Sequence, residues 1–299
     1  MASDRGPASA GADRSALKGV REPMQDRQPD VIGRLRAAGC VFAEEEAALL
    51  AAEAATTAGL EELVRQRLSG LPLEQVLGWA EFCGLRILID RRVFVPRRRT
   101  EYLVRRAARL LRSRAHERPV VVDLCCGTGA VGAALAALAG PLELHAADVD
   151  PAAAACARRN LAPLGGAVHE GDLYAPLPGR LRGRVDLVVV NAPYVPTGQI
   201  GMMPPEARLH EPLVSLDGGP DGLALQRRVA AGVRDWLAPG GALLLETSRR
   251  QAPQTAAILA AQGLGTRVFT SRKRDAAAVL GDSAAGPDGA GAGAAGAGG

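Results

Sequence analysis

Val120-Val121-Val122-Asp123-Leu124-Cys125-Cys126-Gly127-Thr128-Gly129 is the stretch that decides the fold of this chain. Its first half has the β-branched composition of a buried strand. The two glycines then allow a sharp turn into the small-residue run that begins at Ala130, so we predict a helix over Ala130 to Ala139. A strand, a glycine-rich turn and a helix in this order are typical of the first unit of a nucleotide-binding α/β sheet.

Strands and helices alternate from Thr100 onward, which is the pattern of a parallel sheet covered by helices on both faces. Besides the strand at Val120 to Leu124, we predict six strands, near Leu142 to Ala147, Ala167 to Glu170, Val185 to Val190, Ala242 to Glu246, Thr266 to Thr270 and Ala276 to Leu280. We expect the helix before the fifth strand to end at Leu237-Ala238-Pro239-Gly240-Gly241. The predicted fold class is α/β, a doubly wound, mostly parallel, seven-stranded Rossmann-like sheet at residues 100–281.

The residues outside the sheet suggest a smaller domain and two tails. Apolar residues at helical spacing predict a helical bundle at residues 31–71. Residues 72–99 read as a linker with a β-hairpin, whose strands we expect at Ile87 to Ile89 and Val93 to Val95. Residues 1–30 and 282–299 are predicted to be disordered tails, because Gly, Ala, Pro and isolated charges bury too little apolar surface to offset chain entropy.

Composition narrows the class of protein further. The chain has 299 residues, of which 47% are hydrophobic and 3% aromatic, as in a soluble globular protein. No segment resembles a membrane span or signal peptide, so we predict a cytoplasmic location with no membrane partner and reduced cysteines. No cysteine pair has Cys-x-x-Cys spacing and the four histidines are scattered, so no metal site is predicted.

Two further acidic residues at predicted strand ends favour a nucleotide-type cofactor. Asp148 ends the second strand about twenty residues after the glycine turn, where an acid can accept both ribose hydroxyls. Asp172 ends the third strand and could hold an adenine amino group. The alternative for each is an ordinary turn or N-cap residue. We expect Asp123 to face the cofactor's amino-acid end. Cys125 stands where glycine is expected, so its side chain must point away from the ligand or narrow the site.

Asn191-Ala192-Pro193-Tyr194 follows the fourth strand and would share this crevice. Two oxygen acceptors, the Asn191 side chain and the Ala192 carbonyl, could hold the hydrogens of a planar NH₂ group and aim its lone pair. Pro193 fixes the turn, and Tyr194 offers a flat face for stacking. The alternative is a plain turn after a buried strand. Next to the cofactor crevice, the tetrapeptide suggests methyl transfer to a planar NH₂ group.

Several blocks together carry a family resemblance. They are Pro72 to Gly78 with Glu81 to Gly84, Phe94-Val95-Pro96-Arg97-Arg98-Arg99-Thr100-Glu101, Glu211-Pro212, and Asp217 to Leu223. With the tetrapeptide, they resemble the HemK-type protein-glutamine methyltransferases, which methylate the Gly-Gly-Gln side-chain amide of class 1 peptide chain release factors. The resemblance spans about Leu71 to Leu280.

The resemblance implies a cofactor, a partner and a set of site residues. The cofactor would be S-adenosylmethionine, and the partner a release factor that docks on the helical bundle of a monomeric enzyme. The glutamine amide would bind at Asn191 and the Ala192 carbonyl. The implied cofactor-binding residues are Asp123, Cys125, Cys126, Gly127, Thr128, Gly129, Asp148, Asp172, Leu173 and Asn191. The implied substrate-binding residues are Phe82, Arg97, Thr100, Glu101, Tyr194 and Glu211.

Three departures from the family pattern leave the substrate open. Ala192 replaces a proline of the usual Asn-Pro-Pro-Tyr, Cys125 replaces a glycine, and Arg98 replaces a proline. These changes suggest a divergent paralogue with a different protein substrate, or a cofactor-binding regulatory protein without turnover.

A rival activity is methylation of the adenine amino group in DNA or RNA, since the same acceptor geometry serves that amine. Arg91 to Arg118 contains eleven arginines against Glu101 and Glu117, a stripe that could meet phosphates. It could equally be a solvated helix face, and the blocks before Glu101 argue against a nucleic-acid substrate.

Overall fold

The computed structural model describes residues 28–114 and 116–283, and the chain splits after Leu77 into two compact units. The tails predicted at residues 1–30 and 282–299 fall mainly outside the described residues. Where they are described, Gln28 to Asp30 belong to a helix and Asp282 ends a strand. Among the described residues, no helix has the length and apolar character needed to cross a membrane.

From Gln28 onward, where the structure describes it, the N-terminal unit contains four helices, α2 (Gln28–Ala37), α3 (Ala43–Glu53), α4 (Thr57–Leu68) and α5 (Leu73–Leu77). Thr56 caps α4 by accepting a hydrogen bond from the Gly59 amide. The apolar faces of the first three helices bury Leu35, Leu50 and Leu60, as the helical spacing predicts. One buried ion pair joins α3 to α4, with Arg67 Nε 2.6 Å from Glu46 Oε2.

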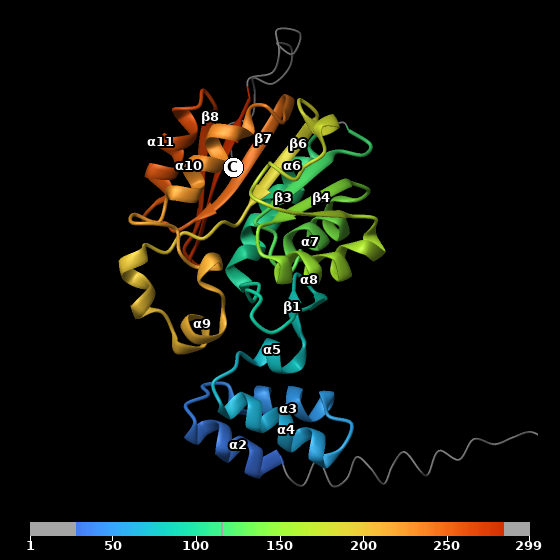
Figure 1. Cartoon of the computed structure of the whole chain (residues 1–299), viewed down its shortest axis with the longest axis vertical. Coiled ribbons are helices and arrows are strands. Elements are labelled where there is room, and N and C mark those ends of the chain that lie inside the picture. The colour runs from blue at the N-terminus through green and yellow to red at the C-terminus, as the bar shows by residue number, and fades with distance from the viewer. Residues whose placement is uncertain (1–27, 115, 284–299) are drawn as a thin grey trace, which may run out of the picture. The chain divides into compact units, whose positions relative to one another are not determined.

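The second unit contains a seven-stranded sheet in the order β5-β4-β3-β6-β7-β9-β8 (Figure 1). The parallel strands are β3 (Val120–Leu124), β4 (Glu143–Asp148), β5 (Ala167–Glu170), β6 (Val185–Val190) and β7 (Leu237–Thr247). The antiparallel edge is formed by β8 (Gly265–Ser271) and β9 (Ala276–Asp282). The predicted doubly wound, mostly parallel, seven-stranded fold is therefore confirmed.

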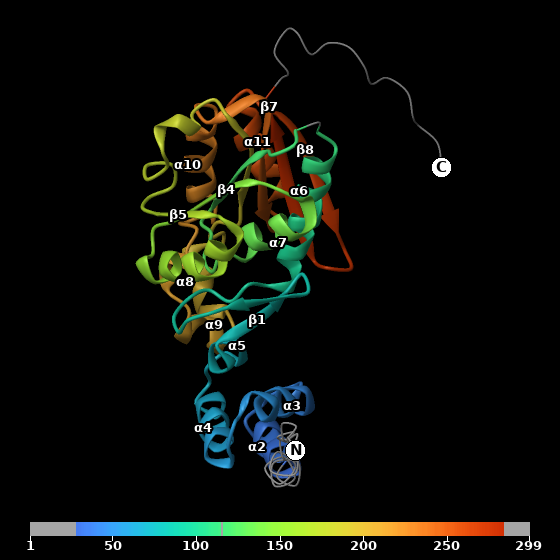
Figure 2. The ribbon, with the colours of Figure 1, turned by 90° about the vertical axis from the view of Figure 1, so that its right-hand side faces the viewer.

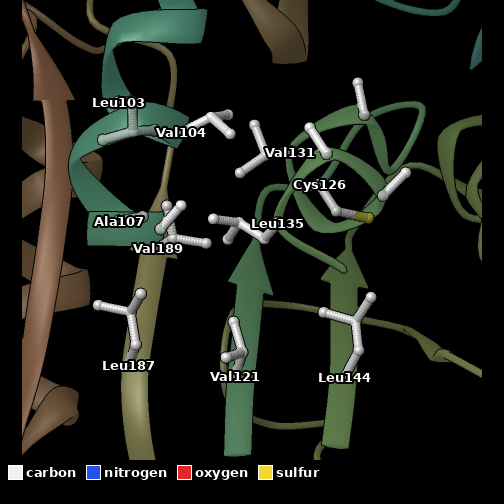
Figure 3. Close-up of a cluster of buried hydrophobic side chains, with 14 of the residues drawn as sticks. Leu103, Val104, Ala107, Val121, Cys126, Val131, Leu135, Leu144, Leu187 and Val189 are labelled. Atoms are coloured by element: carbon white, nitrogen blue, oxygen red, sulfur yellow. The ribbon is translucent and has the colours of Figure 1, made fainter. Parts of the chain in front are cut away.

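Helices cover both faces of this sheet (Figure 2). On one face, α6 (Glu101–Arg112) and α7 (Ala130–Ala139) pack over alternate strand residues such as Val121 and Leu187 (Figure 3). On the other, α10 (Ala224–Val233) and α11 (Ala252–Ala260) pack over the intervening residues. Because successive strand side chains point to opposite faces, the continuous apolar runs fill both layers.

The remaining helical segments lie in the connections between strands. Helix α8 (Pro151–Leu161) follows β4. After β6 come α9 (Pro205–His210) and the 3₁₀ turns η4 (Thr197–Met202) and η5 (Leu213–Ser215). Two more 3₁₀ turns, η2 (Ala162–Leu164) and η3 (Gly179–Leu181), flank β5, and η1 (Arg98–Thr100) precedes α6.

The predicted pairing of the hairpin is wrong: Ile87 and Leu88 lie in a strand, but Val93 to Val95 does not. The hairpin is formed by β1 (Trp79–Phe82) and β2 (Leu85–Leu88), with Cys83 (φ 52°) and Gly84 (φ 78°) in the turn. Two positive φ values give a two-residue turn whose twist matches that of the strands. The residues that we expected to pair, Ile89, Val93 and Val95, instead pack against Ala153 and Cys156 of α8.

The predicted end of the helix before the fifth strand is also wrong. Helix α10 ends at Val233, and Leu237 already pairs with Val185 in the sheet. The pairing register shifts between Val185 and Leu187, so the Pro239-Gly240-Gly241 segment is an irregularity within β7 rather than a helix stop.

Candidate active site

The carboxyl ends of β3, β4, β6 and β7 line a cavity of about 570 Å³. Parallel strands bring these ends to one edge of the sheet, where Leu124 pairs with both Ala147 and Val190. The predicted site residues that line the cavity are Arg97, Cys125, Gly127, Asp148, Asp172, Leu173, Asn191, Ala192, Pro193 and Tyr194. Residues far apart in the sequence therefore meet in one pocket.

The turn after β3 has the tight conformation that its sequence predicts. Gly129 precedes α7 with φ 75°, and a Cβ there would lie 3.0 Å from the Leu161 side chain. Cys125 adopts φ 56° and lines the cavity, so of the two alternatives we expect its side chain to narrow the site. Burial raises the pKa of the Cys125 and Cys126 thiols, which keeps both in the thiol form. Neither cysteine is therefore prepared to act as a nucleophile.

Asp148 is held by the backbone of the same edge. Its Oδ2 accepts a hydrogen bond from the Gly127 amide at 2.8 Å, and its Oδ1 accepts one from the Asp150 amide at 3.0 Å. A carboxylate offers about four lone-pair positions, so each oxygen can accept another donor. Burial raises its pKa, while the two amides oppose that shift. The carboxylate is oriented and still has capacity to bind a ligand.

Asp172 lies on the cavity wall but already has a partner. It forms an ion pair with Arg228 of α10, and both side chains are about half exposed. Leu173, with φ 49°, lines the cavity beside it. The structure therefore gives Asp172 an alternative to the predicted adenine contact.

The tetrapeptide after β6 is fixed by contacts on both sides. Asn191 Nδ2 donates to Thr100 Oγ1 at 3.3 Å, which leaves Oδ1 on the other side of the amide. The Tyr194 carbonyl accepts a hydrogen bond from Gln251 Nε2 at 3.1 Å. Burial raises the pKa of Tyr194 to about 12, so its phenol stays neutral at physiological pH. Arg99 lies over the Tyr194 ring, 5.7 Å from its centroid.

Glu246 is a cavity residue that sequence reasoning missed. Val190 pairs with Leu245, so Asn191 and Glu246 are the next residues on neighbouring parallel strands. Glu246 is 3% exposed, and burial raises its pKa to about 7. An acidic residue at the end of Leu243-Leu244-Leu245 is the same signal that identified Asp148, and it could have been found in that way.

Some predicted cofactor residues lie behind the cavity wall. Asp123 does not line the cavity; it is 1% exposed, and its Oδ2 accepts the Gly132 amide at 2.9 Å. Burial raises its pKa to about 8. Cys126, Thr128 and Gly129 are also buried and absent from the lining. These residues shape the turn, and the expectation that Asp123 faces the ligand is not met.

Some of the predicted substrate-binding residues line the cavity, and others lie outside its lining. Phe82 is fully buried in the core beside α6, so the expected contact with a substrate is wrong for this structure. Glu101 pairs with Arg105 and Arg274, and it too is absent from the lining. Glu211 is buried and accepts hydrogen bonds from the Val95 amide at 3.1 Å and from Arg97 Nη2 at 2.6 Å. It therefore holds Arg97 at the cavity.

Several arginines of the 91–118 stripe are engaged within the chain. Arg112, Arg114 and Arg118 donate to the carbonyls of Leu138, Asp186 and Leu142, respectively. Arg106 lies over the rings of Tyr102 and Phe269. These contacts favour the interpretation of the stripe as a helix face with internal partners.

Comparison with known proteins identifies relatives that match about two thirds of the chain or more. The model of the methyltransferase small domain family matches residues 102–203. A release factor glutamine methyltransferase of Deinococcus radiodurans is 39% identical over 216 residues, which cover 71% of this chain and 75% of that protein. A 4-amino-L-phenylalanine/4-methylamino-L-phenylalanine methyltransferase of Streptomyces pristinaespiralis is 39% identical over 203 residues, 67% of this chain and 69% of that protein.

The coverage varies among further relatives. The match spans 65% of the release factor glutamine methyltransferase of Geobacter sulfurreducens and 76% of that of Bradyrhizobium diazoefficiens. Among solved structures, the catalytic domain of hMettl16 in complex with the MAT2A 3′UTR hairpin 6 has a TM-score of 0.51 and 16% identity, and the match covers 80% of this chain and 82% of that chain. At that identity, the likeness extends to the fold alone. The identities to the sequence relatives show that the chain belongs to the HemK-type protein-glutamine methyltransferase family.

Proposed function

We propose that this protein transfers a methyl group from S-adenosylmethionine to the side-chain amide nitrogen of a protein glutamine. The proposed substrate is the Gly-Gly-Gln motif of a class 1 peptide chain release factor, and the proposed location is the cytoplasm. The observation that carries the proposal is that Asn191 and Asp148 line the same cavity. Family membership supports the proposed reaction. The five free cysteines support the proposed location, because they suit a reducing compartment.

The cavity has the chemistry to hold an adenosine with a charged sulfur. Asp148 keeps lone pairs for ribose hydroxyls after it has accepted two backbone amides. Leu173 and Leu225 supply apolar wall for a base, and Asp172 lies beside them. The cofactor, when bound, supplies an electrophilic methyl group on a positively charged sulfur.

The tetrapeptide would orient the attacking nitrogen. An amide nitrogen attacks poorly because its lone pair is delocalised into the carbonyl group. Asn191 Oδ1 and the Ala192 carbonyl would each accept one N–H, which turns the lone pair toward the methyl group and stabilises positive charge as it develops. Tyr194 stays neutral and offers its ring as a stacking surface for the planar amide.

Exposed apolar side chains offer surfaces for a protein partner. Met202, Leu209, Leu213 and Val214 are 51% to 76% exposed in the segment after the tetrapeptide, and Val214 also lines the cavity. In the N-terminal unit, Val41 and Phe42 are exposed between α2 and α3. Exposed apolar patches commonly mark interaction sites. We propose that the N-terminal helices and this segment bind the substrate protein.

Labelled methyl transfer tests the proposal directly. Purified release factor should acquire label from S-adenosylmethionine, and a release factor with alanine in place of the Gly-Gly-Gln glutamine should not. DNA and RNA serve as parallel acceptors. Label in nucleic acid alone would establish the adenine rival, and cofactor binding without label in any acceptor would establish the regulatory alternative.

A small aromatic amine is the second candidate acceptor. It is favoured by the relative named for 4-amino-L-phenylalanine, which matches this chain at the same 39% identity as the Deinococcus protein. The aromatic amine is also a planar NH₂ group, so the same two oxygens could hold it. 4-Amino-L-phenylalanine therefore belongs in the same assay as a third acceptor.

A further inference from the structure

Asn191 can present either side of its side-chain amide to the cavity, and only one of them suits the proposed reaction. With Oδ1 toward the substrate it accepts an N–H, whereas with Nδ2 in that place two N–H donors would face each other. In the structure, Nδ2 donates a hydrogen bond to Thr100 Oγ1 at 3.3 Å. Thr100 is 2% exposed and does not line the cavity, so it contacts Asn191 from outside the substrate site.

The hydroxyl group of Thr100 does not select this orientation by itself. A hydroxyl group is one donor and two acceptor lone pairs, so it could equally donate its hydrogen to Asn191 Oδ1. The orientation is decided by a third group that takes the Thr100 hydrogen. The Glu246 carboxylate is such a group, because the Thr100 side chain donates a hydrogen bond to it.

The sheet and η1 bring these three side chains together. Asn191 follows β6, Glu246 lies near the end of the neighbouring strand β7, and Thr100 is the last residue of η1. Arg99 Nε lies 3.9 Å from Glu246 Oε1, which favours the ionised carboxylate. An ionised carboxylate only accepts hydrogen bonds, so the Thr100 hydrogen points toward Glu246. The lone pairs of Thr100 Oγ1 are then left for Asn191 Nδ2.

We propose that Glu246 and Thr100 are positioning residues that orient the side-chain amide of Asn191, so that its Oδ1 faces the acceptor nitrogen. The inference rests on the proposed function for the identity of the acceptor. The relay consists of two hydrogen bonds, from Asn191 Nδ2 to Thr100 Oγ1 and from the Thr100 hydroxyl group to the Glu246 carboxylate. Reversal of the Asn191 amide would break the first bond and would turn a donor toward the substrate NH₂ group.

The test is a double-mutant cycle in the full-length protein, with release factor as acceptor at pH 8, above the Glu246 pKa of about 7. Thr100→Val removes the hydroxyl group and should lower kcat about tenfold, the size of one lost hydrogen bond, with KM for release factor and Kd for S-adenosylmethionine within about twofold of wild type. Thr100→Ser keeps the hydroxyl group and should stay within about threefold of wild type. Glu246→Gln should lower kcat by about threefold to tenfold, because a glutamine amide can also donate to Thr100.

The double variant separates a relay from two independent roles. If Glu246 acts through Thr100, adding Glu246→Gln to Thr100→Val should lower kcat by less than about twofold more, whereas independent residues would multiply their losses. The inference is overturned by multiplied losses, by either single variant within about twofold of wild type, by lost cofactor binding, or by a Thr100→Ser variant as impaired as Thr100→Val. Thr100→Ala replaces Thr100→Val in the cycle if the valine variant does not fold.

An NMR readout of the free protein needs no acceptor. The side-chain NH₂ signal of Asn191, identified by its absence in Asn191→Ala, should shift in both Thr100→Val and Glu246→Gln. It should stay in place in Glu143→Gln, a control at the start of β4, at the end of the strands opposite the cavity. An unshifted signal in Glu246→Gln would overturn the relay.

The relay and the proposed function can fail separately. If the wild type labels 4-amino-L-phenylalanine but no release factor, the proposed substrate is wrong, and the cycle is measured with that amine. If the wild type labels no acceptor but the NMR signal shifts as expected, the proposed function is rejected and the relay stands. Multiplied losses in an active enzyme reject the relay alone.

Discussion

Gly222→Ala should disable the site from outside the cavity. Gly222 is buried, with φ +76°, and its Cα faces the tetrapeptide. A Cβ at this position would lie 2.3 Å from the Tyr194 carbonyl oxygen and 2.5 Å from Gln251 Nε2, whereas real Cβ contacts under 3.0 Å essentially do not occur. The two atoms that it would meet are joined to each other by a hydrogen bond of 3.1 Å. The added methyl group therefore displaces the Tyr194 carbonyl or the Gln251 side chain that donates to it.

The size of the effect follows from these distances. Relief of the contact requires the Tyr194 carbonyl to move by about 0.7 Å or the Gly222 backbone to retreat. A displacement near 1 Å at reacting groups costs on the order of 10²-fold in rate, so we expect kcat/KM to fall by roughly 30-fold to 100-fold. The left-handed backbone and a strained hydrogen bond should together cost about 2 to 3 kcal/mol of stability.

The assay compares Gly222→Ala with Gly198→Ala in η4. Gly198 lies in the segment after the tetrapeptide, but a Cβ there would meet nothing within 4 Å and its φ is not positive. Methyl transfer to release factor gives kcat/KM, and urea unfolding gives stability. A Gly222→Ala enzyme within threefold of wild type, or a Gly198→Ala enzyme equally impaired, would refute the reasoning about the loop.

Three further outcomes are expected. Asn191→Ala should lower kcat/KM by about 10² to 10³, equivalent to about 2.7 to 4 kcal/mol of transition-state stabilisation; a loss below tenfold in the methyl-transfer assay would argue against its proposed role. Cys125→Gly should relieve about 1 kcal/mol of left-handed strain and widen the cavity, so calorimetry should give tighter S-adenosylmethionine binding; weaker binding would contradict the view that Cys125 narrows the site. Folding raises the Glu246 pKa from 4.5 to about 7, so this group destabilises the fold increasingly as pH rises from about 4.5 through 7, by up to about 3 kcal/mol. The free energy of unfolding of Glu246→Gln, measured in urea, should therefore exceed that of the wild type by more at pH 8 than at pH 5. An equal difference at both pH values would contradict the burial of an ionisable carboxyl.

The local sequence pattern was sufficient to predict most strands of the sheet. Strands β3, β5 and β6 and helix α7 have the bounds that the apolar runs and glycine turn predict. These elements are readable because a parallel strand buried on both faces is an uninterrupted apolar run, bounded by polar or glycine residues. The linker was misread because Ile87 to Ile89 and Val93 to Val95 are also short apolar runs, and periodicity does not separate a strand from a segment packed on α8.

The positions of the candidate site residues were predictable only in part. Asp148 and Asn191 could be placed at a common edge because carboxyl ends of parallel strands converge there. The sequence could not predict that Phe82 and Asp123 lie outside the cavity, because burial depends on which elements pack over a residue. The contact between Thr100 and Asn191 joins residues 91 positions apart. Nothing in either segment indicates the other as its partner.

By itself, the sequence determined the order of strands and helices and the edge at which the chemistry gathers, because both follow from short-range periodicity and strand direction. Only the tertiary structure decided which groups at that edge are satisfied and which are not. Asp172 meets Arg228, Glu211 meets Arg97, and Glu246 keeps one oxygen without a donor. Hydrogen-bond satisfaction depends on distances of a few ångströms between distant segments, and these distances exist only once the chain has packed.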